Sequence, residues 1–175
     1  IAIFDPEFFE APVPPELEAL DDSKNLKPAV REALYPAVLR HARFAAAVHV
    51  SSRLVDRLRI AAALEFAILR SLRRAELAGH APLTALLDGN YKLPRVRQAF
   101  PWLDAHSIVK GDSRVLSIAA ASIMAKVSRD RRMERYGKMF PGYGLEQHKG
   151  YGTAAHRIAI QERGPCPIHR RSYSW

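Results

Sequence analysis

The sequence predicts an α/β fold in which helices cover a sheet. Short apolar, partly β-branched runs alternate along the chain with longer segments whose apolar residues recur every three or four positions. No internal repeat or low-complexity stretch interrupts this order. Two of the short runs end in an aspartate, and sites in such folds form at the carboxyl ends of strands. The 175 residues are enough for one domain with a substantial core.

In the first half we expect a helix, a strand and a second helix. Proline suits the first position of a helix over Pro28–His41, although Pro36 should kink or shorten it. A strand over Arg43–Val50 ends at Ser51–Ser52, where a hydroxyl can cap the next helix. One face of that helix should pack on the sheet, through residues spaced by three and four: Leu54, Leu58, Ala61, Leu64 or Glu65, Ile68 and Leu72.

The second half predicts two strands followed by helices. The strands are Leu83–Leu87 and Ser107–Val109. A core helix rich in alanine and serine runs over Val115–Tyr136, where small side chains allow close approach to a neighbour. A last helix over Thr153–Arg163 is ended by a Gly-Pro pair.

Charge and composition limit the classes of function. Lysine and arginine total 27 against 18 acids, a net charge of +9 that attracts polyanions such as nucleic acid or an anionic membrane. No run approaches the roughly 18 uninterrupted apolar residues of a membrane span, so we expect no membrane partner. The lone Cys166 excludes an intrachain disulfide and a cysteine-rich zinc site, and fits a reducing, cytoplasmic location.

Asp88 and Asp112 are the candidate metal ligands. Each follows a predicted strand, and converging carboxylates can hold Mg²⁺ or Mn²⁺, hard cations that prefer oxygen ligands. Two such ions about 3.5–4 Å apart can stabilise the attacking and leaving oxygens of phosphodiester cleavage. The alternative is that Asp88 starts an Asp-Gly-Asn turn and Asp112 caps the following helix. Spacing alone leaves both interpretations open.

A basic, glycine-rich segment, His148–Thr153, is the candidate nucleic-acid interface. It offers cationic and hydroxyl groups for phosphates and an aromatic face for a sugar or base. The alternative is a solvated loop with Tyr151 turned inward. The spacing of His148, His156 and His169 matches no zinc signature, so structural or phosphate-contacting roles are favoured.

Taken in order, several short motifs resemble bacterial ribonuclease HII over nearly the whole chain. They are Asp21-Asp22-Ser23-Lys24, Leu87-Asp88-Gly89-Asn90, Val109-Lys110-Gly111-Asp112, the helix Ser117–Val127, His148-Lys149-Gly150-Tyr151-Gly152-Thr153 and Pro167-Ile168-His169-Arg170. The resemblance implies an RNase H-like mixed sheet flanked by helices, with a C-terminal helical element bordering the substrate groove. It also implies a monomer with a single domain over 1–175, divided into a core over 1–136 and a groove element over 137–175.

The resemblance further implies a metal-dependent endoribonuclease. Such an enzyme hydrolyses the RNA strand of RNA–DNA hybrids and cuts 5′ of ribonucleotides embedded in a DNA duplex, leaving 3′-hydroxyl and 5′-phosphate ends. Asp88 and Asp112 would be catalytic residues that bind Mg²⁺ or Mn²⁺. Lys24 would contact a phosphate, Lys149 would bind nucleic acid, and Tyr151 would pack against the sugar at the RNA-to-DNA junction and help sense the 2′-hydroxyl.

Two departures from the family pattern qualify this expectation. The family opens with a strand bearing Asp-Glu-Ala-Gly-Arg-Gly, which completes the metal site and recognises the 2′-hydroxyl, and the 175 residues do not contain it. Because Ile1–Asp5 resembles the end of the family's next strand, we expect the first strand to be missing and this chain alone to be inactive. Arg59 and Leu64 stand where the family has Asn and Thr.

Two rival functions remain open. One is a non-catalytic protein that binds RNA–DNA hybrids and lacks the first two carboxylates. The other is a basic α/β scaffold that binds nucleic acid by charge alone, with no preference for hybrids and with steep salt dependence.

Overall fold

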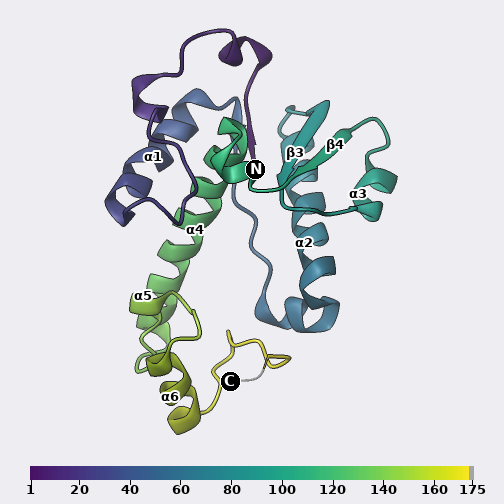
Figure 1. Ribbon diagram of the computed structural model, residues 1–175. Coiled ribbons are helices and arrows are strands. Elements are labelled where there is room, and N and C mark those ends of the chain that lie inside the picture. The colour runs from purple at the N-terminus through teal and green to yellow at the C-terminus, as the bar shows by residue number, and fades with distance from the viewer. Residues whose placement is uncertain (174–175) are drawn as a thin grey trace. The chain divides into compact units, whose positions relative to one another are not determined.

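The computed structural model describes residues 1–173 (Figure 1). The chain forms two compact units. The first comprises Ile1–Val48 and Glu65–Val127, and the second comprises His49–Leu64 and the chain from Ser128 onward. The single domain over 1–175, divided between residues 136 and 137, stays a prediction.

The first unit contains the strands, which pair two by two. β1 (Ala2–Ile3) is antiparallel to β2 (Phe44–Ala45), and β3 (Thr84–Asp88) is parallel to β4 (Asp104–Ile108). In Figure 1 the pair β3 and β4 lies beside α2 and α3. Helices therefore flank two small sheets of two strands each, one antiparallel and one parallel, and the predicted α/β class is confirmed.

The three predicted strands have other bounds in the structure. The strand expected over Leu83–Leu87 is β3, shifted by one residue to Thr84–Asp88. The strand expected over Arg43–Val50 is only β2, which pairs with the two residues of β1. Next to this pairing, Ala46 and Ile1 exchange two more backbone hydrogen bonds, at 2.9 and 3.0 Å. The strand expected over Ser107–Val109 starts earlier, at Asp104, since β3 provides a partner for all five residues of β4. The helix α3 (Pro94–Ala99), which lies between β3 and β4 in the chain, was not predicted.

Helices α1 (Pro28–His41) and α4 (Leu116–Met139) form one core of the first unit. The bounds of α1 are those predicted, but Pro36 does not end the helix. Ala37 of α1 and Ala120 of α4 are 1% and 0% exposed, and both belong to this core. The close approach of α4 to a neighbour through its small side chains stays a prediction. This core contains Leu17, Ala37, Val38, Ala120 and Met124, and Leu17 comes from the short 3₁₀ helix η2 (Pro15–Leu17), which follows η1 (Pro6–Phe9).

A second core of the first unit supports β3 and β4. Its buried members are Leu72, Leu93, Val96, Phe100 and Leu103, and side chains of β3 pack against them. They come from the C-terminal part of α2 (Ser52–Leu77), from α3 and from the segments around it. This packing fixes the strand that ends at Asp88.

The helix α2 is interrupted at Arg59, where φ is 65° and ψ is 164°. This left-handed backbone is unfavourable for a residue with a Cβ, and local sequence signals did not predict it. The interruption changes the helical phase, so the expected single apolar face is wrong in part: Leu72 is buried, whereas Ala61 is exposed. Ser51 caps the start as predicted, accepting a hydrogen bond from the Leu54 amide at 3.3 Å.

The second unit is helical. It contains the N-terminal part of α2, the C-terminal part of α4, and α5 (Leu145–His148) and α6 (Ala154–Arg163). Gly164 follows the end of α6, as predicted. The helix starts one residue later than expected, because Thr153 is its cap and accepts a hydrogen bond from the His156 amide at 3.3 Å. Within residues 1–173, the helices are all too short or too polar to cross a membrane.

The buried Glu65 offers a test of the packing in the first unit. Its carboxylate, on a residue 7% exposed, accepts hydrogen bonds from the backbone amides of Arg95 at 2.6 Å and Val96 at 3.3 Å. Glu65→Ala should lower the free energy of unfolding by about 1–3 kcal/mol, because it leaves these donors unpaired. Glu65→Gln keeps an acceptor oxygen and should lose less. Urea unfolding measures the stability of both variants. An unchanged midpoint for the alanine variant would contradict the role of Glu65 as an acceptor for the first amides of α3.

Candidate functional site

Asp88 lies at the end of β3 and links it to the loop after β4. Its Oδ1 accepts a hydrogen bond from the Gly111 amide at 2.9 Å. The next residue, Gly89, has a φ of 106°, and a Cβ there would stand 2.6 Å from the Tyr91 ring, so the turn requires glycine. The side chain of Asp88 therefore connects the end of β3 to the loop that follows β4.

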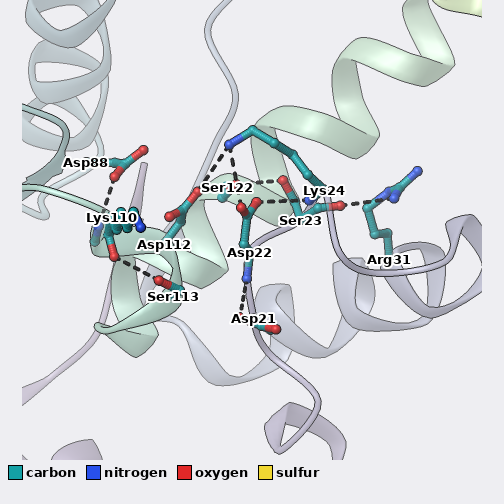
Figure 2. Close-up of polar contacts among 11 residues, drawn as sticks. Asp21, Asp22, Ser23, Lys24, Arg31, Asp88, Lys110, Asp112, Ser113 and Ser122 are labelled. Carbon is teal, nitrogen blue, oxygen red and sulfur yellow. Dashed lines mark hydrogen bonds and ion pairs between the residues drawn. The ribbon is translucent and has the colours of Figure 1, made fainter.

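Asp112 lies in that loop, within the short 3₁₀ helix η3 (Gly111–Ser113), and is only 7% exposed. Lys110, which precedes it, has a φ of 54°, and its carbonyl accepts a hydrogen bond from the Ser113 hydroxyl at 3.1 Å. The carboxylate of Asp112 pairs with the ammonium of Lys24 at 3.6 Å (Figure 2). A buried negative charge is thus matched by one cation.

Lys24 reaches two carboxylates at once. Its Nζ lies 3.6 Å from Oδ2 of Asp22 and 3.6 Å from Oδ2 of Asp112. Asp22 first, and then Asp112, raise the pKa of the Lys24 ammonium above its ordinary value. The segment that carries Lys24 is attached to α4, because the hydroxyls of Ser23 and Ser122 form a hydrogen bond of 2.8 Å. Figure 2 shows Lys24 and Asp112 pointing toward one another from different segments.

Asp22 and Ser122 were not singled out by sequence reasoning. The signal was present, since both fall in motifs that carry the resemblance, but neither motif indicates that Asp22 would share the ammonium of Lys24. The Asp22 carboxylate also accepts a hydrogen bond from the Lys24 amide at 2.9 Å. Such a turn fixes the backbone that carries Lys24.

The donor set of this cluster suits a hard divalent cation only in part. Carboxylate oxygens of Asp88 and Asp112 are suitable ligands, and the burial of Asp112 beside an ammonium indicates a site that favours positive charge. Over residues 1–173, however, no group of three or more His, Cys, Asp or Glu side chains is arranged to hold a metal ion. Two of the four carboxylates implied by the resemblance are therefore available here.

Lys149 and Tyr151 lie in the second unit, on the loop between α5 and α6. The Lys149 ammonium donates to the Glu134 carboxylate at 2.6 Å and to the Glu146 carbonyl at 2.7 Å, so its charge is already paired. Tyr151 is 55% exposed, and the guanidinium of Arg129 stands 4.6 Å from the centre of its ring. The alternative in which Tyr151 turns inward is wrong.

Three histidines surround this loop, and their ring nitrogens bind protein groups. His156 Nε2 and His169 Nε2 lie 2.9 Å apart, and the His148 ring stacks on His156 at 4.2 Å between centroids. His148 Nε2 lies 2.6 Å from the Tyr143 carbonyl. These bonds support the structural interpretation over metal binding. The same unit holds the tail, because Asp56 Oδ2 accepts from the Arg171 amide at 2.8 Å.

Comparisons with known proteins agree with the expected family and fold. A family model described as ribonuclease HII matches residues 15–175. The ribonuclease HII of Parasynechococcus marenigrum (strain WH8102) is 45% identical over 157 residues, 89% of this chain and 66% of that protein. That of Pelodictyon phaeoclathratiforme (strain DSM 5477 / BU-1) is 41% identical over 172 residues, 98% of this chain and 79% of that protein.

The chain spans about two thirds of the length of some of these relatives. The ribonuclease HII of Delftia acidovorans (strain DSM 14801 / SPH-1) is 43% identical over 90% of this chain and 63% of that protein. A chain in the solved structure of the PCNA:RNase HII complex from Archaeoglobus fulgidus has a similar fold. The TM-score is 0.66 at 23% identity, over 88% of this chain and 78% of that one. This likeness supports the fold.

Proposed function

The chain belongs to the ribonuclease HII family, and from this premise we propose that it comes from a metal-dependent endoribonuclease acting on RNA–DNA hybrids. The proposed reaction is hydrolysis of the RNA strand and cutting 5′ of a ribonucleotide embedded in DNA, with 3′-hydroxyl and 5′-phosphate ends. The observation that carries the proposal is the placement of Asp88 and Asp112 around one loop, with Lys24 on the buried carboxylate. Location in the cytoplasm and action as a monomer complete the proposal.

Asp88 and Asp112 would hold Mg²⁺ or Mn²⁺ through their carboxylate oxygens. A divalent ion held there would stabilise negative charge on the phosphate oxygens and would help a water molecule lose its proton. The protein's own part is positioning: the Gly111 amide orients Asp88, and burial within η3 limits the motion of Asp112. Two further carboxylates, of the kind found in Asp-Glu-Ala-Gly-Arg-Gly, would complete the set.

Lys24 and Tyr151 have separate proposed roles in binding. The Lys24 side chain is 75% exposed although it touches two carboxylates, so its ammonium can also meet a phosphate oxygen. Tyr151 presents an exposed ring of suitable size to a sugar. Lys149 is also proposed to contact nucleic acid, but its pairing with Glu134 supports a role in shaping the loop as well.

Lys24→Ala should weaken binding by a similar factor for RNA–DNA hybrid and for DNA containing one ribonucleotide. The reason is that a phosphate contact carries no sequence information. The slope of log affinity against log salt should fall by about 1, as expected for one lost phosphate contact. Fluorescence anisotropy over a salt series measures this. Lys27→Ala is the control, since it removes the same charge from an exposed position near the start of α1.

A non-catalytic hybrid-binding protein is the second candidate. It is favoured by one observation: no third metal-ligating side chain joins Asp88 and Asp112 within the described part of the chain. Reading the complete gene separates the two candidates. An upstream Asp-Glu-Ala-Gly-Arg-Gly in the same reading frame would exclude the second.

A charge-only scaffold, the third candidate, predicts equal affinity for a DNA duplex and for a hybrid of the same length. Competition binding at two salt concentrations tests it. A preference for the hybrid that persists at the higher salt concentration would exclude this candidate, because charge density alone does not recognise the ribose 2′-hydroxyl.

A further inference from the structure

The backbone around the buried histidines determines which nitrogen of each ring carries the proton. The amide of Cys166 donates to His169 Nδ1 at 2.9 Å, so that nitrogen is an acceptor without a proton. A neutral His169 therefore carries its proton on Nε2. That nitrogen lies 2.9 Å from His156 Nε2 and must donate to it.

The direction continues through the next ring. Because His156 Nε2 accepts, the proton of neutral His156 is on Nδ1, which lies 2.9 Å from the carbonyl oxygen of Tyr151. The result is a chain of three hydrogen bonds with one direction, from the Cys166 amide through both rings to the Tyr151 carbonyl. His156 and His169 are 2% and 7% exposed, so both rings are buried.

Other contacts make the same backbone rigid. The Tyr151 carbonyl also accepts from the Thr153 amide at 2.8 Å, and the Tyr151 amide donates to the His148 carbonyl at 2.9 Å. His148 is oriented by the Gly150 amide, which donates to its Nδ1 at 3.2 Å. Burial lowers the pKa of both His156 and His169, which favours neutral rings near pH 7.

We propose that His169 and His156 are positioning residues for Tyr151, acting through this directed chain of hydrogen bonds. The inference rests on the proposed role of Tyr151 at the ribonucleotide junction. The ring of Tyr151 is exposed while its backbone is held from the buried side, so the chain fixes where the ring stands without occupying its face. The two buried histidines thereby influence substrate discrimination through Tyr151, without contacting the substrate themselves.

The first test uses no activity. In the complete gene product labelled with ¹⁵N-histidine, the ring shifts should place the proton of His156 on Nδ1 and that of His169 on Nε2 at pH 7. The opposite tautomer in either ring, or a doubly protonated ring, would overturn the inference. The measurement is made on the unsubstituted protein, so it does not depend on whether a variant folds or on whether the proposed function holds.

The second test separates positioning from simple stability. His169→Gln keeps a side-chain amide near the position of Nε2 and can still donate to His156, whereas His169→Asn keeps only an acceptor for the Cys166 amide. Hydrogen exchange of the Thr153 amide should become faster in the asparagine variant than in the glutamine variant. Equal exchange in the two variants would count against a link through His156.

The third test joins the chain of hydrogen bonds to the reaction. On a duplex with one ribonucleotide, His169→Asn should lower kcat/KM at least about 5-fold, and His169→Gln should restore most of it. In a Tyr151→Ala background, His169→Asn should cause no further loss, because the residue to be positioned is gone. Fully additive losses would overturn the inference. No effect of Tyr151→Ala itself would instead remove the proposed role of Tyr151.

Discussion

Asp112→Asn in the complete protein is expected to abolish metal-dependent cleavage while the fold stays intact. Asparagine has nearly the same shape, but it removes the negative charge that the proposed metal site needs and that pairs with Lys24 at 3.6 Å. Charge stabilisation by a bound ion contributes several kcal/mol, so kcat should fall by about 1,000-fold or more. Asp88→Asn should have an effect of the same order.

Folding and specificity of this effect need their own controls. Lys24 keeps Asp22 as a partner when Asp112 is neutral, so the thermal unfolding midpoint should change little. Asp104→Asn is the matched control, because Asp104 is an exposed carboxylate at the opposite end of β4. The Asp104→Asn variant should cleave at the rate of the unsubstituted protein. If Asp88→Asn or Asp112→Asn cleaves as fast as the unsubstituted protein, that residue is removed from the mechanism.

Tyr151→Ala is expected to reduce cleavage at a single ribonucleotide by about 5- to 150-fold in kcat/KM. The range corresponds to the roughly 1–3 kcal/mol that an aromatic contact with a nucleotide contributes by alanine substitution. Tyr151 is 55% exposed, so truncation removes a contact surface rather than part of the core. Steady-state cleavage of a duplex with one ribonucleotide measures the loss.

Tyr151→Phe is the control for this prediction, because it keeps the ring and the backbone contacts. It should retain most of the activity, since packing on a sugar depends on the ring face. A phenylalanine variant as impaired as the alanine variant would show that the hydroxyl, and not the face, carries the role. Equal activity in all three proteins would exclude Tyr151 from the junction.

Local chemistry made much of the fold predictable. Pro28 at a first helical position and Gly164 after a helix each act within one turn, and these predictions are confirmed. The position of Asp88 at a strand end also follows from a local pattern, an apolar run followed by Asp-Gly-Asn.

Features that depend on distant partners were not predictable. The bounds of β2 follow its pairing with a distant segment, β1, and the backbone of Arg59 is left-handed although nothing in its neighbouring residues requires it. The pairing of Lys24 with Asp112, and of Lys149 with Glu134, joins residues that no local pattern connects. A motif could name the first lysine, but it could not show which carboxylate the lysine would meet.

Cleavage of a DNA duplex with one ribonucleotide, in Mg²⁺ or Mn²⁺, tests the central claim most directly. The 175-residue chain and the complete product of its gene are compared side by side, with the ends of the products identified. We predict cutting on the 5′ side of the ribonucleotide, with 3′-hydroxyl and 5′-phosphate ends, by the complete protein alone. Absence of cutting by either protein would contradict the enzyme and favour the hybrid-binding alternative.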